Sequence, residues 1–110
     1  MKYPFEKLFL ICTGERCNDS KNGDDRGEMI RGELKDLNKK LGRKATVRVC
    51  ATSCLDLCEV GPNMIAEPDG TVYSHLTRKS ARRAYDGEMG DGPAAIDVML
   101  TPDSLKRARK

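Results

Sequence analysis

The sequence predicts an α/β domain built from a strand–helix–strand unit, a hairpin and a further helix. Three observations carry this prediction: a continuous apolar run at residues 8–11, apolar residues at helical spacing between residues 30 and 41, and a turn at residues 68–70 between two short apolar runs. A chain of 110 residues is long enough for one hydrophobic core and too short for two. We therefore expect one α/β core with its loops gathered at the ends of the strands.

The first strand and the loop after it are predicted from composition. Residues 6–12 form the strand, because Leu8-Phe9-Leu10-Ile11 is apolar throughout, as in a strand buried on both faces. Residues 15–25 are polar and rich in Gly, Asn and Asp, which predicts a loop.

The first helix follows this loop. Asp25 and Glu28 have the spacing of a capping box, so the helix should begin there. Apolar residues then recur at intervals of three or four, which predicts one apolar face of a helix made up of Ile30, Leu34, Leu37 and Leu41. Gly42 should end this helix.

The second half contains shorter elements. Residues 45–50 alternate as a strand, and a strand–helix–strand order predicts that it runs parallel to the first strand. Residues 64–66 and 71–73 should form a hairpin around Pro68-Asp69-Gly70. The remaining predicted elements are a helix over 76–85, a strand over 94–100 and a short basic helix from Thr101 to Lys110.

Charge and hydropathy exclude several classes of protein. No apolar run approaches the roughly 18 residues of a membrane helix, and the run at residues 8–11 is too short for a signal peptide. We therefore predict a cytoplasmic protein without membrane contact. Residues 51–75 carry four acidic and no Lys or Arg residues, although the whole chain has a net charge of +3. An acidic stretch beside the cysteine motif is not typical of nucleic-acid binding.

Four of the five cysteines form two close pairs. Cys12 and Cys17 are separated by four residues, and Cys54 and Cys58 by three. Both pairs lie near the predicted carboxyl ends of strands, where open α/β sheets place their sites. In a reducing compartment, paired thiols are more often metal ligands than disulfides. Neither pair has the Cys-x2-Cys spacing typical of zinc, so spacing favours an iron–sulfur cluster but leaves zinc and unrelated thiols open.

The second pair lies in a longer motif. The chain reads Cys54-Leu55-Asp56-Leu57-Cys58-Glu59-Val60-Gly61-Pro62, and later Pro68-Asp69-Gly70-Thr71-Val72-Tyr73. This motif resembles the thioredoxin-like [2Fe-2S] ferredoxins, whose second half reads Cys-x3-Cys-x2-Gly-Pro, a short strand, Pro-Asp/Glu-Gly and a strand with an aromatic residue. The opening Phe9-Leu10-Ile11-Cys12-Thr13-Gly14, with Cys17 after it, is similar to the first ligand strand of that family. The related subunit of respiratory complex I has a similarly close first pair.

The resemblance covers residues 8–76 and implies a fold and an activity. The fold would be thioredoxin-like, a mixed four-stranded sheet with helices packed on it and a cluster in loops at one end. Residues 1–85 would form this domain, and residues 86–110 a C-terminal extension. The Gly61–Pro62 bond would be a candidate for the cis form. Cys12, Cys17, Cys54 and Cys58 would bind one [2Fe-2S] cluster.

The function implied is one-electron transfer between redox protein partners, with no catalysis of its own. The resemblance also suggests a homodimer. The alternatives are a structural zinc or thiol module, and an accessory subunit in which a cluster senses redox state or gates a larger oxidoreductase. Colour and metal content distinguish the zinc module from the ferredoxin.

Several other residues have two interpretations. Cys50 has no counterpart in the family motif and is expected to be a small buried residue that ends a strand; the alternative is that it replaces Cys54 as a ligand. Thr13, Gly14 and Ser53 either donate hydrogen bonds to cluster sulfurs or are ordinary turn residues. Asp56 and Glu59 form either an acidic docking face or a solvated loop. His75 is expected to be structural, and the basic runs at 78–83 and 106–110 to be solvated.

Overall fold

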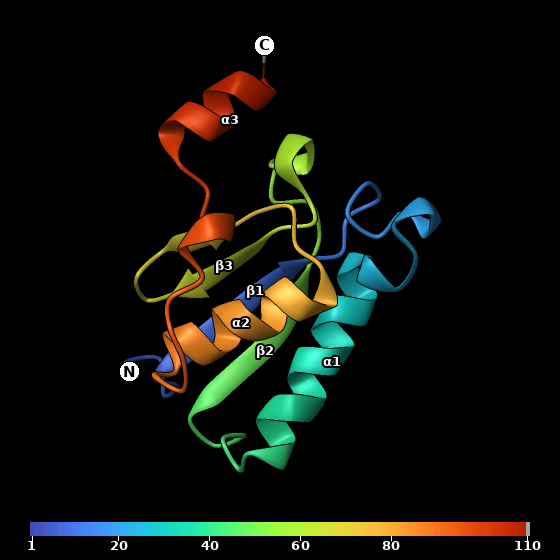
Figure 1. Cartoon of the computed structure of the whole chain (residues 1–110). Helices are drawn as coiled ribbons and strands as arrows, with labels where there is room; N and C mark the ends of the chain where they lie inside the picture. Colours follow the sequence, from blue (N-terminus) through green and yellow to red (C-terminus); the bar gives the residue numbers. More distant parts are fainter. Residues whose placement is uncertain (110) are drawn as a thin grey trace.

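The computed structural model describes residues 1–109 and shows a four-stranded mixed sheet with helices α1 and α2 packed on one face (Figure 1). Along the chain the elements are β1 (Lys7–Cys12), η1 (Ser20–Asp25), α1 (Gly27–Lys40), β2 (Val47–Thr52), η2 (Cys58–Val60), β3 (Met64–Glu67), β4 (Thr71–Tyr73), α2 (Arg78–Glu88), η3 (Ile96–Val98) and α3 (Pro102–Ala108). None of the helices in this part of the chain has the length and hydrophobicity needed to span a bilayer.

The sheet has the strand order β2-β1-β3-β4. β1 and β2 are parallel, and β3 is antiparallel to both β1 and β4, so the predicted parallel unit and hairpin are confirmed. The predicted bounds of the second strand were wrong. Thr46 and Val47 both donate backbone hydrogen bonds to the Arg43 carbonyl, which keeps Ala45 and Thr46 in a turn. β2 therefore begins at Val47. It continues to Thr52, which pairs with Cys12 at the end of β1.

The hydrophobic core lies between the sheet and the two helices. Phe9 and Ile11 of β1 are fully buried, and the Phe9 ring centroid lies 5.1 Å from that of Tyr85 on α2. The predicted apolar face of α1 is confirmed at Ile30, Leu34 and Leu37. Leu41 is exposed, because α1 ends at Lys40 and Gly42 takes the left-handed conformation just beyond it.

The start of α1 differs from the predicted capping box. The Asp25 carboxylate accepts a hydrogen bond from the backbone N–H of Arg78 instead of capping its own helix. The Asn18 side chain takes that place, because its Oδ1 lies 2.9 Å from the backbone nitrogen of Glu28. A Cβ on Gly27 would come within 2.0 Å of the Cys12 carbonyl oxygen, so α1 begins in direct contact with the end of β1.

The C-terminal segment returns to the edge of the sheet. The predicted strand over 94–100 was wrong: the chain forms the short helix η3 and a single bridge between Tyr73 and Met99. Two backbone hydrogen bonds join this segment to β4 and the residue after it, from Ser74 to Val98 and from Leu100 to Val72. The Ser74 hydroxyl also donates to the Val98 carbonyl at 3.5 Å. The last helix, α3, is confirmed over Pro102–Ala108, and its predicted end at Lys110 lies outside the described residues. Thr101 and Ser104 form its capping box.

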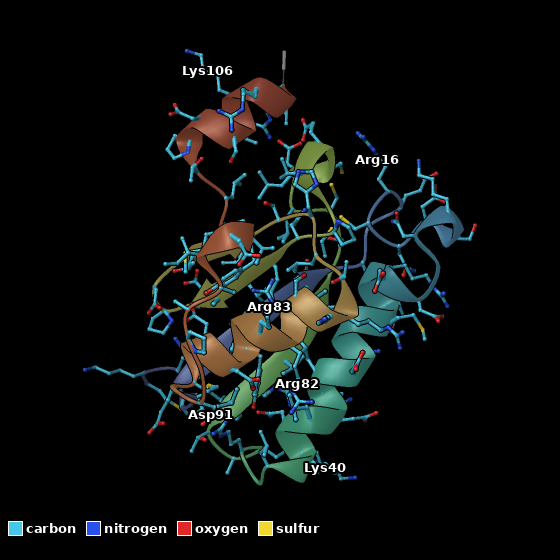
Figure 2. All side chains as sticks on the ribbon, in the orientation of Figure 1. Arg16, Lys40, Arg82, Arg83, Asp91 and Lys106 are labelled. Carbon is cyan, nitrogen blue, oxygen red and sulfur yellow. The ribbon has the colours of Figure 1, made fainter. Side chains whose placement is uncertain are left out.

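α2 also has a capping box that the sequence analysis did not identify. Thr77 and Ser80 form it, and the helix runs from Arg78 to Glu88 instead of over 76–85. The arginines of α2 are paired on the surface: Arg78 lies near Asp24, Asp25 and Glu33. Arg82 pairs with Asp86, and Arg83 binds Asp97 through two hydrogen bonds. Figure 2 shows Arg82 and Arg83 on this helix.

Candidate metal centre

The four paired cysteines converge on the end of the sheet where β1 and β2 finish. Cys12 is the last residue of β1, and its backbone N–H donates to the Asn63 carbonyl at 3.1 Å. The backbone N–H of Thr13 donates to the Thr52 carbonyl at 2.8 Å, which ties the first cysteine segment to the end of β2. Cys54 follows β2 in the loop that leads into η2, and Cys58 is the first residue of η2.

The cysteines are arranged as two pairs of thiols, and all five cysteines of the chain are free. The Sγ atoms of Cys54 and Cys58 are 3.3 Å apart. Cys17 interacts with the thiol of Cys12 and with the charge of Cys58. In the described part of the chain, no group of three or more His, Cys, Asp or Glu side chains is arranged to hold a metal ion.

The two pairs differ in burial. Cys12 and Cys17 are each 1% exposed, whereas Cys54 is exposed and Cys58 half-buried. Burial, together with the hydrogen bond and charge of Cys12, raises the pKa of the Cys17 thiol to about 12. The pKa of Cys58 is raised chiefly by its hydrogen bond with Cys54. One face of the site is therefore sealed by the core, and the other is open to solvent.

Close backbone contacts hold the two cysteine segments together. A Cβ on Gly61 would lie 2.6 Å from the Cys17 sulfur, and a Cβ on Gly14 would lie 3.0 Å from the Cys54 Cα. Each glycine thus lets one segment pass directly against a cysteine of the other. The Gly61–Pro62 bond is cis, as the resemblance suggested. The backbone N–H of Gly27 donates to the Cys17 carbonyl at 2.8 Å, which fixes the loop between Cys12 and α1.

The loop that carries Cys54 and Cys58 is held by the C-terminal tail. Arg109, just after α3, donates to the Asp56 carbonyl at 2.6 Å and to the Glu59 carboxylate at 3.2 Å. The pKa of Glu59 is lowered by a hydrogen bond from its own backbone and by the charges of Arg109 and Arg16. Arg16 and α3 lie at the same end of the molecule (Figure 2). The acidic stretch therefore has basic neighbours from both ends of the chain.

Thr13, Gly14 and Ser53 take part in backbone packing at this end of the sheet. The Thr13 hydroxyl donates to the Thr52 carbonyl at 2.7 Å, and the Ser53 carbonyl accepts from the Thr52 hydroxyl at 2.8 Å. The Thr13 hydroxyl is thus bound to the end of β2, and Gly14 packs closely against Cys54. His75 is exposed, and its backbone N–H donates to the Val60 carbonyl.

Cys50 occupies a different position from the one expected. It lies inside β2 opposite Leu10, two register positions before the Cys12–Thr52 pair, and it is half-buried instead of buried at a strand end. The reason is that β2 runs two residues further than predicted.

Two contact residues of the site were not identified from the sequence. Asn63 is fully buried, and its side chain reaches both Leu57 and Cys17. The signal in the sequence was a polar residue, Asn63, directly before the apolar residues of β3. Arg109 contacts a loop about fifty positions away along the chain, and a basic C-terminal tail by itself does not indicate such a contact.

Comparisons with known proteins give a consistent result. No family model matches the chain. A protein of Priestia megaterium with the name "Putative 2Fe-2S ferredoxin" is 29% identical over 91 residues, which are 83% of this chain and 67% of that protein.

Two solved structures share the fold. The wild-type thioredoxin-like [2Fe-2S] ferredoxin from Aquifex aeolicus superposes with a TM-score of 0.72 and 15% identity, over 90% of this chain and 99% of that one. A second structure of a thioredoxin-like [2Fe-2S] ferredoxin from Aquifex aeolicus gives a TM-score of 0.69, 15% identity, and coverage of 90% and 93%. The fold is therefore thioredoxin-like, and the resemblance predicted from the sequence is confirmed.

Proposed function

We propose that this protein is a one-electron carrier that binds a single [2Fe-2S] cluster through Cys12, Cys17, Cys54 and Cys58. The observation that carries the proposal is the meeting of two thiol pairs, one buried and one partly exposed, at one end of a thioredoxin-like sheet. Two pairs of thiolates suit a centre of two irons, with one pair for each iron. The names of the similar proteins support the same cofactor.

The surroundings fit a bound cluster. Thiolates are soft ligands suited to iron–sulfur centres, and the close approach of Gly61 to the Cys17 sulfur leaves no side chain between the two segments. A bound cluster supplies one-electron chemistry, passing between two Fe(III) ions and a mixed-valence pair. The residues of this chain supply the thiolates, exclude water at Cys12 and Cys17, and leave Cys54 and Cys58 accessible to a partner.

The greater exposure of Cys54 and Cys58 indicates the side of the molecule on which electrons would be exchanged. A partner protein would approach the Cys54–Cys58 side, where Arg16, Arg109 and Glu59 provide charges of both signs. Such charges affect the rate of encounter more than the final affinity. We infer redox protein partners, a cytoplasmic location and, from the resemblance alone, a homodimer. Light scattering of the purified protein gives the oligomeric state directly.

The test is the colour and composition of the protein. We expect aerobically purified protein to be red-brown, to contain two irons and two acid-labile sulfides per chain, and to bleach when dithionite donates one electron. Cys50→Ser should keep the spectrum, and Ser at any of the four proposed ligands should remove or alter it.

The opposite result is equally distinct. A colourless protein with one bound zinc after anaerobic reconstitution would replace the electron carrier with a structural metal module. Loss of the cluster in Cys50→Ser, with normal content in Cys17→Ser, would overturn the ligand assignment. If a partner is captured only by the cluster-loaded form, and electron transfer through the protein is absent, the accessory-subunit alternative is favoured.

A further inference from the structure

Asn63 occupies the point where the cysteine segments meet. It is 0% exposed and follows directly after Gly61 and Pro62. Its backbone carbonyl accepts a hydrogen bond from the backbone N–H of Cys12 at 3.1 Å. The main chain of Asn63 therefore fixes the end of β1, where the first cysteine lies.

The side chain of Asn63 points to the other two segments. Its Nδ2 lies 3.0 Å from the Leu57 carbonyl oxygen, which belongs to the residue before Cys58, and 3.7 Å from the Cys17 Sγ. A single amide group thus contacts the loop of the exposed pair and a sulfur of the buried pair. Both protons of the Nδ2 group have acceptors in this arrangement.

The other atom of the amide has no such partner. Asn63 Oδ1 is buried and forms no hydrogen bond with the described residues. Buried polar atoms are normally paired, and an unpaired one is unfavourable for stability. An apolar side chain at this position would not bury an unpaired oxygen. We therefore attribute the role of Asn63 to its Nδ2 group, which donates to Leu57 and Cys17.

We infer that Asn63 is a positioning residue that sets the reduction potential of the proposed centre by donating a hydrogen bond to the Cys17 sulfur while it holds the Leu57 carbonyl. The inference rests on the proposed function. Adding one electron increases the negative charge on the cysteine sulfurs and the irons. A donor aimed at a sulfur stabilises that extra charge, so it raises the potential.

The chain offers a matched control in Asn38. This residue is also buried, and its Nδ2 donates to a backbone carbonyl, that of Val47, at 2.9 Å. Its Oδ1 accepts from the Tyr85 hydroxyl at 2.7 Å. Asn38 lies on α1 and supports the fold, so the same substitution there tests for a purely structural effect.

The experiment compares wild type, Asn63→Leu and Asn38→Leu in their cluster-loaded forms by equilibrium redox titration, with dithionite as the one-electron donor. We expect Asn63→Leu to lower the equilibrium constant for reduction about tenfold, which is about 59 mV for one electron. Asn38→Leu should lower the thermal unfolding midpoint and leave the potential unchanged. Equal potentials in wild type and Asn63→Leu, or an equal shift in Asn38→Leu, would overturn the inference.

A second variant and a cluster-free measurement cover a failure of Asn63→Leu to bind the cluster. Asn63→Ala should show the same shift. If neither variant binds the cluster, folded cluster-free protein in which Cys17 is alkylated faster than in wild type supports the positioning role. Variants that do not fold at all would make Asn63 a structural residue and overturn the inference. A wild-type protein without iron and sulfide would instead mark failure of the proposed function itself.

Discussion

The Cys12–Cys17 pair and the Cys54–Cys58 pair lie at the same end of the sheet in opposite surroundings. The first pair is buried, with Cys12 at the end of β1 and the Cys17 carbonyl bound to the first turn of α1. The second pair lies in a partly exposed segment that is held by Arg109, just after the short C-terminal helix α3. One side of the site is thus part of the folding core, and the other is a surface feature.

This difference separates two tasks that a single site must perform. Rigid, water-free surroundings hold ligand geometry and affect the potential. An exposed rim allows a partner to approach closely enough for electron exchange. We call Cys12 and Cys17 the inner pair, and Cys54 and Cys58 the outer pair. The reactivity of the inner pair should therefore respond to changes that disturb the core, and that of the outer pair to changes in its loop and in α3.

The largest difference expected between the pairs is in thiol reactivity. In cluster-free protein, iodoacetamide should modify Cys54 first and Cys12 and Cys17 at least about 100-fold more slowly, because buried thiols react only after local opening of the fold. The raised pKa of Cys17 adds to its protection, since the thiolate is the reactive form. Peptide mapping by mass spectrometry at successive times measures each rate. Equal rates for all four thiols would contradict the described burial.

A smaller effect should follow from a methyl group placed beside the inner pair. Gly61→Ala puts a Cβ 2.6 Å from the Cys17 sulfur, so either the Cys17 side chain or the backbone must shift. We expect a loss of about 1–3 kcal/mol in the free energy of unfolding, as for other overpacked sites, together with reduced iron content. Urea unfolding of the cluster-free protein and iron analysis measure the two effects.

Gly32→Ala is the control for this substitution. Gly32 lies inside α1, and a Cβ there would meet no atom within 4 Å. Alanine in a helix interior should stabilise the protein by about 0.5–1 kcal/mol. Equal behaviour of the two variants would show that the contact between Gly61 and Cys17 does not constrain the site.

The two regions also differ in how much of them the sequence predicts. The strand–helix–strand order, the hairpin and the α1 face follow from local patterns, and the cysteine pairs follow from spacing and from the motif that ends in Gly61–Pro62. Asn63 and Arg109 act through contacts with residues that are distant in the sequence, so no local pattern indicates their partners. Residues 94–100 were predicted as a strand but contain η3, because the apolar residues Ile96, Val98 and Met99 fit either structure.

The smallest expected effect concerns the outer loop alone. Arg109→Ala removes the hydrogen bond to the Asp56 carbonyl and the ion pair with Glu59, while the inner pair keeps all its contacts. We expect alkylation of Cys54 and Cys58 to become at most a few-fold faster, because exposed ion pairs contribute little to stability. The rates at Cys12 and Cys17 should not change.

Arg107→Ala serves as the matched control for Arg109. Arg107 belongs to α3, is exposed and forms no ion pair within residues 1–109, so its removal should leave all four rates unchanged. A similar acceleration in both variants would attribute the effect to the loss of positive charge near the loop. Faster labelling of the inner pair in Arg109→Ala would show that α3 stabilises the core as well as the rim, and the separation of the two regions would then fail.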